Sequence, residues 1–511
     1  MRRRPLVPLL AVSVMAALAP GLAAAAPGAQ SPSALASPAS TEADALRPYT
    51  RQKPAWKRCG PDTPAAFRCA TLKVPLDYRK PGGRQIDVAI SRLRTSAPGK
   101  RHGVLLSNPG GPGGPGLELP LELDRQLPRQ VKERYDLIGF DPRGIGRSTP
   151  VDCGLSADEN TLLRPLKAFE KNVAWARDLA DKCRTKAGDT VAHITTRNTA
   201  RDMDVLRAVL GERKISYIGV SYGTALGAVY TQLFPRRADR FVLDSAVDPE
   251  RMWREMFRIW APESERAFQR WAKWTAAHDA TYRLGDTPAA VSKSFWDVVA
   301  RADRDPVVVD GTPLDGAGVR DLVRREFFTV RTAAERVVKL KEAAGGGVES
   351  PDPSEPLPEE DVSGAMAVVC GDASWPRDPG TYLRDSIRDA AKYPLYGDFA
   401  AGVLPCAFWD RPVEPVTVVD NEVPALIVQN EWDSQTPLTT AQAMHRQLKG
   451  SRMVTVDEGE GHGVYGTNPC ADSAANSYLA TGELPAADVT CHATPGKRQQ
   501  ASPLPAPGPL R

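Results

Sequence analysis

The sequence contains one serine whose surroundings fit nucleophilic catalysis. Ser221 is the central residue of Gly219-Val220-Ser221-Tyr222-Gly223, which matches the pattern G-x-S-x-G. An apolar run, 215–219, leads into this motif, and a helix-like stretch, 224–233, follows it. In such a strand–turn–helix setting, the two glycines let strand and helix pass closely while the turn lifts the hydroxyl above a sheet. The motif therefore predicts Ser221 as the nucleophile.

A serine hydroxyl attacks only when a base removes its proton, and histidine commonly serves as that base. His462, in Glu460-Gly461-His462-Gly463, follows the last expected strand, where a loop can hold the imidazole above the sheet. The chain order Ser…acid…His that accompanies this serine motif also selects His462. The other five histidines precede Ser221, or lie in an insertion, on an amphipathic helix or near the C-terminus: His102, His193, His278, His445 and His492.

A carboxylate must orient the histidine. Asp433 comes shortly after the expected strand 425–428, at the strand end where active-site loops collect. Asp244, at the end of the preceding strand, is the main rival, because some folds of this type carry the acid there. Glu431 and Asp457 are further alternatives. The chain-order rule favours Asp433.

The negatively charged oxygen of the tetrahedral intermediate needs two backbone N–H donors. One is expected from Tyr222, the residue after the nucleophile. The other is expected from the glycine-rich loop 108–114. Its two prolines have no N–H, so Gly111 is the first choice and Gly110 the second. A phosphate-binding loop is the alternative, but no G-K-[ST] follows these glycines.

The segments that must position these residues alternate between strand-like and helix-like from about residue 73 to residue 248. A hairpin is expected around Lys80-Pro81-Gly82-Gly83, and a helix with a capping box is expected at Thr199-Ala200-Arg201-Asp202. Strands separated by helices predict an α/β fold, with a mostly parallel sheet and helices on both faces. The expected strands are 86–93, 104–106, 135–140, 215–219 and 241–243.

The alternation stops between residues 249 and 415, and strand-like runs resume at 425–428 and 453–456. This predicts a large helical cap inserted before the last two strands. Its aromatic residues recur at near-helical spacing, and we expect them to form the cap's own core rather than a substrate cage. These residues are Trp253, Phe257, Trp260, Phe268, Trp271 and Trp274.

The composition restricts the possible partners. The 511 residues carry a net charge of only +4, with basic and acidic residues interspersed. No basic stripe indicates a nucleic-acid partner, and the cysteine spacings do not match a zinc site. We therefore expect no nucleic-acid partner, no metal and no cofactor. Nothing in the sequence indicates an oligomeric state.

The N-terminus indicates export. Three arginines, 2–4, precede a short apolar stretch, 6–18, and small residues offer a cleavage site near Ala25 or Ala26. A retained membrane anchor is the alternative, but the stretch is short and Pro8 interrupts it. The eight cysteines are an even number, as expected in an oxidising compartment. Pairing of neighbours along the chain would give Cys59–Cys69, Cys153–Cys183, Cys370–Cys406 and Cys470–Cys491.

These observations predict a chain organised into six segments. We expect a signal peptide, a linker or pro-segment rich in Ala, Pro and Ser, the first part of the sheet core, the helical cap, the C-terminal part of the core and a disordered tail. Their expected bounds are 1–26, 27–50, 51–248, 249–415, 416–493 and 494–511.

Several motifs together resemble those of the secreted actinobacterial tripeptidyl aminopeptidases, which are relatives of prolyl iminopeptidase within the α/β-hydrolases. The resemblance covers nearly all of the chain between Trp56 and Cys491. The matching pieces are Asn108-Pro-Gly-Gly-Pro-Gly113, Phe140-Asp-Pro-Arg-Gly144, Gly219-Val-Ser-Tyr-Gly-Thr224, Val369-Cys-Gly-Asp372, Asp433 with Thr436-Pro437, and Gly461-His462-Gly463.

The resemblance implies an α/β-hydrolase fold and release of short peptides, typically tripeptides, from the free N-termini of peptides or proteins. It also implies that no metal is needed. The related iminopeptidases carry His-Gly-Gly at the oxyanion loop, where this chain has Pro109-Gly110-Gly111. An N-terminal exopeptidase also needs a carboxylate for the substrate's α-ammonium group. The cap offers several, among them Glu250, Glu255, Glu263 and Glu265.

Three functions therefore compete. A secreted serine exopeptidase is the leading hypothesis. A carboxylesterase or small-molecule amide hydrolase is the second, because one fold hosts many chemistries on the same catalytic residues. A catalytically silent binding protein on a hydrolase scaffold is the third, and the presence of Ser221, Asp433 and His462 argues against it.

Overall fold

The buried apolar runs of the sequence become the strands of one ten-stranded sheet. The computed structural model describes residues 44–156, 159–161, 163–327, 329–346 and 362–493. The expected signal peptide, most of the expected linker and nearly all of the C-terminal tail lie outside the described residues. The sheet contains β1 (Lys57–Arg58), β2 (Phe67–Pro75), β3 (Gln85–Leu93), β4 (Gly103–Asn108), β5 (Tyr135–Phe140), β6 (Ile215–Val220), β7 (Ala238–Asp244), β10 (Ala425–Trp432), β11 (Arg452–Glu460) and β12 (Val489–His492).

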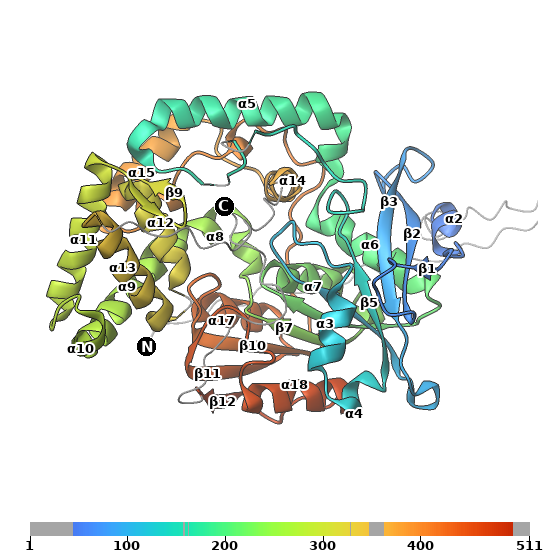
Figure 1. The fold of residues 1–511 in the computed structure, drawn as a ribbon. Helices are drawn as coiled ribbons and strands as arrows, with labels where there is room; N and C mark the ends of the chain where they lie inside the picture. Colours follow the sequence, from blue (N-terminus) through green and yellow to red (C-terminus); the bar gives the residue numbers. More distant parts are fainter. Residues whose placement is uncertain (1–43, 157–158, 162, 328, 347–361, 494–511) are drawn as a thin grey trace, which may run out of the picture. The chain divides into compact units, whose positions relative to one another are not determined.

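The strand order is β1-β2-β3-β5-β4-β6-β7-β10-β11-β12 (Figure 1). All pairings from β5 to β12 are parallel, which confirms the predicted mostly parallel sheet. The β2–β3 pair is antiparallel and closes around the expected hairpin turn. Three strands follow the insertion, not two: β12 has only four residues and no continuous apolar run, so its sequence gave no strand signal.

Successive residues of the central strands point to opposite faces of the sheet, and both faces are covered by helices. In β4, Leu105 belongs to one buried cluster, while Val104 and Leu106 belong to another. This explains why β4, β5 and β6 are buried at every position and mostly apolar. One cluster includes residues of α6 (Thr196–Val209), α7 (Tyr222–Leu233) and α17 (Leu438–Gln447), and the other includes residues of α3 (Leu119–Gln126), α4 (Arg129–Lys132) and α18 (Pro469–Thr481).

Helix α6 begins earlier than the sequence indicated. Its N-cap is Thr195, whose side chain accepts a hydrogen bond from the backbone N–H of Asn198. The expected capping box at 199–202 is therefore wrong and lies inside the helix. Thr199 donates its hydroxyl to the carbonyl of Thr195 instead. Both threonines precede the same apolar face, so the local pattern did not distinguish them.

The insertion between β7 and β10 is helical, as predicted, apart from one short hairpin. Part of it has its own hydrophobic core, in which Phe268, Trp271 and Phe295 are in contact. Figure 1 shows α9 to α13 gathered on one side of the sheet. The insertion's elements are α8 (Arg254–Arg258), α9 (Trp260–Ala276), α10 (Asp279–Tyr282), α11 (Pro288–Arg304), β8 (Val307–Val309), β9 (Thr312–Leu314), α12 (Gly316–Glu326), α13 (Val330–Ala344), α14 (Ser363–Asp372), α15 (Pro379–Lys392) and α16 (Gly397–Ala400).

The later part of the insertion packs differently. Val369 of α14 and Tyr382 of α15 belong to the large cluster that also contains Val104 and Leu106 of β4. The long helix α5 (Phe169–Ala187) joins the same cluster through Trp175 and Leu179. The insertion therefore contacts the sheet core over a broad area. Near the start of the described chain, helix α2 (Arg47–Thr50) buries Tyr49 against this cluster.

All four predicted disulfides are present: Cys59–Cys69, Cys153–Cys183, Cys370–Cys406 and Cys470–Cys491. Each closes a short loop, with sequence separations from 10 to 36 residues. The last of them ties β12 to α18. This bond anchors the short edge strand that the sequence did not reveal.

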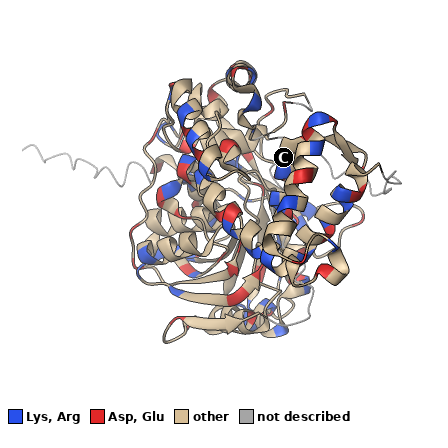
Figure 2. Cartoon of the chain, turned by 90° about the vertical axis from the view of Figure 1, so that its left-hand side faces the viewer, with Lys and Arg blue, Asp and Glu red and all other residues tan. Residues whose placement is uncertain are grey.

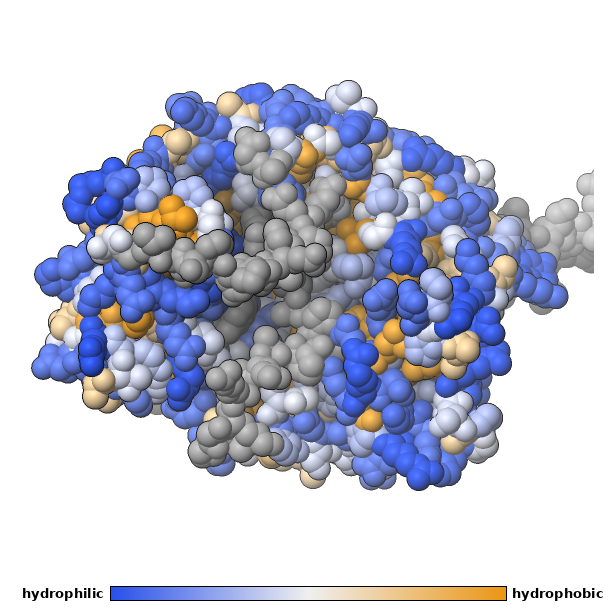
Figure 3. All heavy atoms as spheres, in the orientation of Figure 1, coloured by the Kyte–Doolittle hydropathy of each residue, from blue (hydrophilic) through white to orange (hydrophobic). Residues whose placement is uncertain are grey.

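The surface is polar and mixed in charge. Figure 2 shows basic and acidic residues interspersed along the visible ribbon. In the face shown in Figure 3, hydrophobic residues form small separate patches among hydrophilic ones. Within the described residues, none of the helices combines the length and apolar character that crossing a bilayer requires.

The Phe140–Gly144 motif is a structural element rather than a catalytic one. Arg143 is fully buried and forms two hydrogen bonds to the carboxylate of Asp202, at 2.6 and 2.7 Å. Its guanidinium also donates to the carbonyls of Pro75, Leu76 and His193. One side chain thus joins the β2–β3 hairpin, the end of β5 and helix α6.

We expect Arg143→Met to lower the free energy of unfolding by about 3–5 kcal/mol, because it leaves the Asp202 carboxylate buried without its partner. Equilibrium unfolding in urea, followed by fluorescence, measures the change. Lys293→Met is the matched control, since it removes an ion pair to Asp297 that is exposed to solvent. It should leave the unfolding midpoint nearly unchanged. Equal effects of the two substitutions would contradict this role of Arg143.

Candidate active site

Ser221 lies in the sharp turn between β6 and α7, with φ 57° and ψ −124°. This left-handed backbone geometry is strained for a residue with a side chain. A Cβ atom on Gly219 would lie 2.4 Å from the carbonyl oxygen of Gly223. A Cβ atom on Gly223 would lie 2.7 Å from the carbonyl oxygen of Asn108. Close packing therefore requires both glycines of the motif, and the turn projects Ser221 from the end of β6.

His462 and Asp433 meet at the ends of neighbouring parallel strands. The imidazole Nδ1 lies 2.8 Å from Asp433 Oδ2, and both side chains are buried. Asp433 also accepts the backbone N–H groups of Gln435, at 2.8 Å, and Thr436, at 3.0 Å. The Thr436 hydroxyl donates to Oδ2, the oxygen that also faces the imidazole, at 2.9 Å. These bonds fix the carboxylate, which holds the imidazole by its Nδ1.

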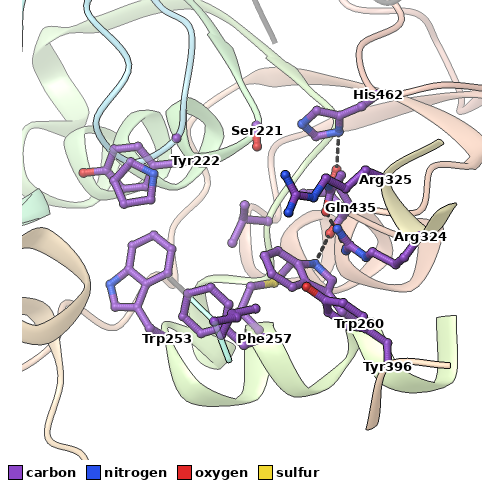
Figure 4. Close-up of a pocket in the computed structure, with 16 residues that line it drawn as sticks. Ser221, Tyr222, Trp253, Phe257, Trp260, Arg324, Arg325, Tyr396, Gln435 and His462 are labelled. Carbon is purple, nitrogen blue, oxygen red and sulfur yellow. Dashed lines mark hydrogen bonds between the residues drawn. The ribbon is translucent and has the colours of Figure 1, made fainter. Parts of the chain in front are cut away.

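Ser221 and His462 line the same cavity (Figure 4). The two predicted oxyanion residues, Gly111 and Tyr222, line it as well. The fold thus brings together, around one space, residues that lie more than a hundred positions apart in the chain. Such an arrangement allows an imidazole to accept the proton of a serine hydroxyl that attacks a carbonyl group.

The electrostatics of the pair favour a charged carboxylate beside an imidazole that gains a proton readily. Burial raises the pKa of Asp433, but the charge of His462 and the hydrogen bonds to the carboxylate outweigh it and hold that pKa below its usual value. Burial lowers the pKa of His462, but the neighbouring Asp433 outweighs this and raises it above the usual value. The pair therefore stabilises the imidazolium that forms when serine gives up its proton.

Asp244, the main rival for the acid, has a different role. Its carboxylate accepts the backbone N–H groups of Val464, at 2.9 and 3.0 Å, and Tyr465, at 2.8 Å, just after His462. Complete burial raises the pKa of Asp244 to about 6. It holds the histidine loop rather than the histidine ring. The other two candidate acids contact groups other than His462: Glu431 accepts the N–H of Glu458, and Asp457 contacts His492.

The backbone donors around Ser221 are not equivalent. The N–H of Gly110 donates to the side chain of Asn108 at 3.1 Å. A Cβ atom on Gly110 would lie 2.5 Å from the carbonyl oxygen of Val220, so this residue packs directly against the nucleophile turn. In the part of the chain that the structure describes, the N–H groups of Gly111 and Tyr222 have no acceptor. These two remain free to bind an oxyanion, which favours Gly111 over Gly110.

The cavity, together with the solvent space at its mouth, has an empty volume of about 790 Å³. Its wall includes Trp253, Phe257 and Trp260 from the start of the insertion (Figure 4). The expectation that the aromatic residues form only the cap's own core is therefore wrong for these three. It holds for Phe268, Trp271 and Trp274, which lie in or against the cap's cluster. The spacing of the aromatic residues predicts that this region is helical, but it does not show which of these residues face Ser221.

A buried network supports the oxyanion side of the cavity. Asp372, at the end of α14, accepts the indole N–H of Trp253 at 3.0 Å and two hydrogen bonds from Thr196, at 2.6 and 2.7 Å. The Thr196 hydroxyl also lies 2.8 Å from the hydroxyl of Tyr222. Burial raises the pKa of Asp372 to about 6. The sequence motif at 369–372 drew attention to this aspartate, but not to its partners.

The four cap carboxylates that the sequence offered for an α-ammonium group do not line this cavity. Glu250 and Glu255 are exposed, Glu265 accepts the N–H of Leu395, and Glu263 lines a neighbouring pocket. Two arginines of α12, Arg324 and Arg325, line the cavity instead. Sequence reasoning did not single them out, because nothing in the helix pattern distinguishes them from surface arginines.

Comparison with known proteins gives related sequences along most of the chain. A protein-family model described as TAP-like protein matches residues 393–491. A tripeptidyl aminopeptidase of Streptomyces lividans is 36% identical over 476 residues, which cover 86% of this chain and 87% of that protein. The chain belongs to the tripeptidyl aminopeptidase family.

The family is chemically varied. Serine protease Hip1 of Mycobacterium tuberculosis is 30% identical to this chain, over 84% of the chain and 88% of that protein. Carboxylesterase B of the same organism is also 30% identical, over 83% of the chain and 86% of that protein. The predicted family and the predicted class of serine hydrolase are therefore confirmed.

The raised pKa of His462 gives an expected pH dependence. The base must be neutral to accept the serine proton, so kcat/KM falls as the pH drops through the pKa of His462. We expect the midpoint of this acid limb to lie above the ordinary imidazole value of 6.5. Asp433→Asn should lower activity by about 10⁴-fold. The midpoint of the acid limb of this variant's residual activity should also shift to lower pH, because the negative charge that raises the pKa of His462 is gone. Stopped assays over a pH series measure both effects.

Asp244→Asn is the control for the choice of acid. Asparagine keeps an oxygen that can accept the N–H groups of Val464 and Tyr465, and Asp244 is only a minor contributor to the pKa of His462. This substitution should therefore cost far less activity than Asp433→Asn and should shift the acid limb less. A larger loss at position 244 than at position 433 would reverse the assignment.

Proposed function

We propose that this chain is a secreted serine exopeptidase that removes short peptides, typically tripeptides, from free N-termini through an acyl-enzyme on Ser221. The observation that carries the proposal is the buried hydrogen bond between His462 and Asp433 beside the cavity that Ser221 lines. Relatives named tripeptidyl aminopeptidase and serine protease support a peptide as the substrate.

In the first half of the reaction, Ser221 Oγ attacks the scissile carbonyl carbon while His462 Nε2 takes the hydroxyl proton. Asp433 keeps the imidazole in the required tautomer and stabilises its positive charge. The electron pair of the C=O bond moves to oxygen, where the N–H groups of Gly111 and Tyr222 bind it. The C–N bond then breaks, and His462 gives its proton to the departing amine.

In the second half, water attacks the ester that joins the released peptide to Ser221. His462 takes a proton from this water, and the oxyanion forms and collapses in the same place. The C–Oγ bond breaks as His462 returns the proton to Ser221. The products are a short peptide with a free carboxylate and a shortened peptide with a new N-terminus.

An esterase or small-molecule amide hydrolase is the second possibility, and one observation favours it. No carboxylate is present among the described residues that line the cavity, although an exopeptidase needs one to hold an α-ammonium group. A relative named carboxylesterase B agrees with this alternative. The two functions share the same serine chemistry and differ in what fills the cavity.

Secretion is part of the proposal. The positively charged, apolar and small-residue segments at the N-terminus have the order of an export signal. Four disulfides leave no free cysteine among the described residues, which suits an oxidising compartment. Comparison of the N-terminus of protein recovered from the culture medium with that of the cell-associated form tests this directly.

The substrate class is tested with chromogenic di- and tripeptide anilides, each with a free and with an N-acetylated N-terminus. We expect free tripeptide anilides to be hydrolysed much faster than their acetylated forms, because an exopeptidase recognises the α-ammonium group. Equal rates for free and acetylated substrates would overturn the exopeptidase and favour the esterase.

Ser221→Ala is expected to abolish both hydrolysis and labelling by a fluorophosphonate probe, because it removes the nucleophile. Protein mass spectrometry measures the label. Thr224→Ser is a matched control in the same turn, since it keeps the hydroxyl that donates to the carbonyl of Ser221. It should retain labelling. Undiminished labelling of Ser221→Ala would remove Ser221 from the mechanism.

A further inference from the structure

Arg324 is an unusual cation at the wall of the cavity. It lies on α12, has only 3% of its surface exposed and lines the same cavity as Ser221 (Figure 4). Its guanidinium carbon lies 4.4 Å from the centre of the Trp260 ring and 4.9 Å from that of Tyr396. Nη2 donates to the side-chain oxygen of Gln435 at 2.6 Å and to the Ser434 carbonyl at 3.4 Å. All of these partners are formally neutral.

The charge of Arg324 has no carboxylate partner. No acidic oxygen of the described residues lies within ion-pair distance of it, and its Nε–H is buried without an acceptor. Other arginines of the same helix differ: Arg320 pairs with Asp398 at 2.8 Å, and Arg325 pairs with Asp321. A buried guanidinium without a counter-ion is unfavourable, and binding of an anion beside it would relieve that cost.

No residue of the described cavity wall supplies a counter-charge, and Asp433, which acts on Arg324 at longer range, is already bonded to His462. Apart from Arg324 and Arg325, its described lining is aromatic, aliphatic or neutral polar, and contains no acidic side chain. A guanidinium binds a carboxylate through strong, charge-assisted hydrogen bonds, and these are strongest where water is excluded. The cavity therefore has apolar surface for a peptide chain and one buried cation for an acidic group.

We propose that Arg324 is a specificity-determining residue that selects peptides with a glutamate or aspartate among the residues that are released. This inference rests on the proposed function, because it requires the acyl part of a peptide to occupy the cavity. The acidic side chain replaces the missing counter-ion, with the Nε–H of Arg324 as one of its donors. The bond between Arg324 and Gln435 positions the guanidinium for this contact.

The test compares three pairs of tripeptide anilides with free N-termini. Each pair places glutamate or glutamine at the first, second or third position of an otherwise all-alanine tripeptide. The two side chains are nearly equal in size and differ in charge. We expect kcat/KM to be at least about tenfold higher for glutamate at one or more positions. Ratios at or below one at all three positions would overturn the proposal.

Variants then assign the preference to Arg324. Arg324→Met keeps the length of the side chain and removes the charge, so the glutamate-to-glutamine ratio should fall to about one. Arg324→Lys should retain part of the preference for glutamate. Arg320→Met is the matched control: it lies one turn away on the same helix, pairs with Asp398 and does not line the cavity. Its ratio should match that of the unmodified protein. A preference that survives Arg324→Met would overturn the proposal.

A second readout does not depend on peptide hydrolysis. The tripeptides Ala-Ala-Glu-amide and Ala-Ala-Gln-amide, with their positional isomers, are tested for protection of Ser221 against the fluorophosphonate probe. Preferential protection by glutamate peptides, lost in Arg324→Met, supports the role of Arg324 even if no anilide is hydrolysed. Failure of the anilides alone counts against the proposed function. Equal protection by both kinds of peptide counts against Arg324.

Discussion

The hydrogen bond between Asp433 and His462 is the interaction on which the site depends. It joins two loops that leave the sheet at the ends of β10 and β11, which are parallel neighbours. A third strand contributes, because Asp244 at the end of β7 holds the backbone just after His462. The register of three adjacent strands therefore decides whether the imidazole reaches the cavity. This explains why the residues around the pair are so thoroughly buried and hydrogen-bonded.

Much of the fold and of the candidate site could be predicted from the sequence, because the patterns that indicate them lie in short segments or follow from the order of residues along the chain. The strand, turn and helix around Ser221 lie within twenty residues, and Gly219 is needed by a contact inside that segment, while Gly223 is needed by a contact with Asn108. The order of the chain then selected Asp433 and His462 from several acids and histidines. The parallel sheet followed from apolar runs that are buried on both faces. Even the disulfides follow from proximity along the chain.

The remaining features depend on contacts between distant segments, which no local pattern contains. Trp253 and Trp260 have the same helical spacing as Trp271, yet the first two face the cavity and the third lies in the cap's core. Their positions are set by partners elsewhere, since Trp253 donates to Asp372 and Trp260 donates to the carbonyl of Gln435. Strand β12 was missed for a similar reason, because a disulfide stabilises four residues that lack an apolar run.

Strands β7 and β10 are paired directly, although the whole insertion lies between them in the chain. The polypeptide therefore leaves the sheet and returns to it at adjacent positions, so a different insertion could be accommodated without changing the register of any strand. An exchange of this kind would change the insertion residues that line the cavity while Ser221, Asp433 and His462 stay in place. A new module must, however, restore the contacts that Trp260 and Arg324 make with the loop carrying Asp433.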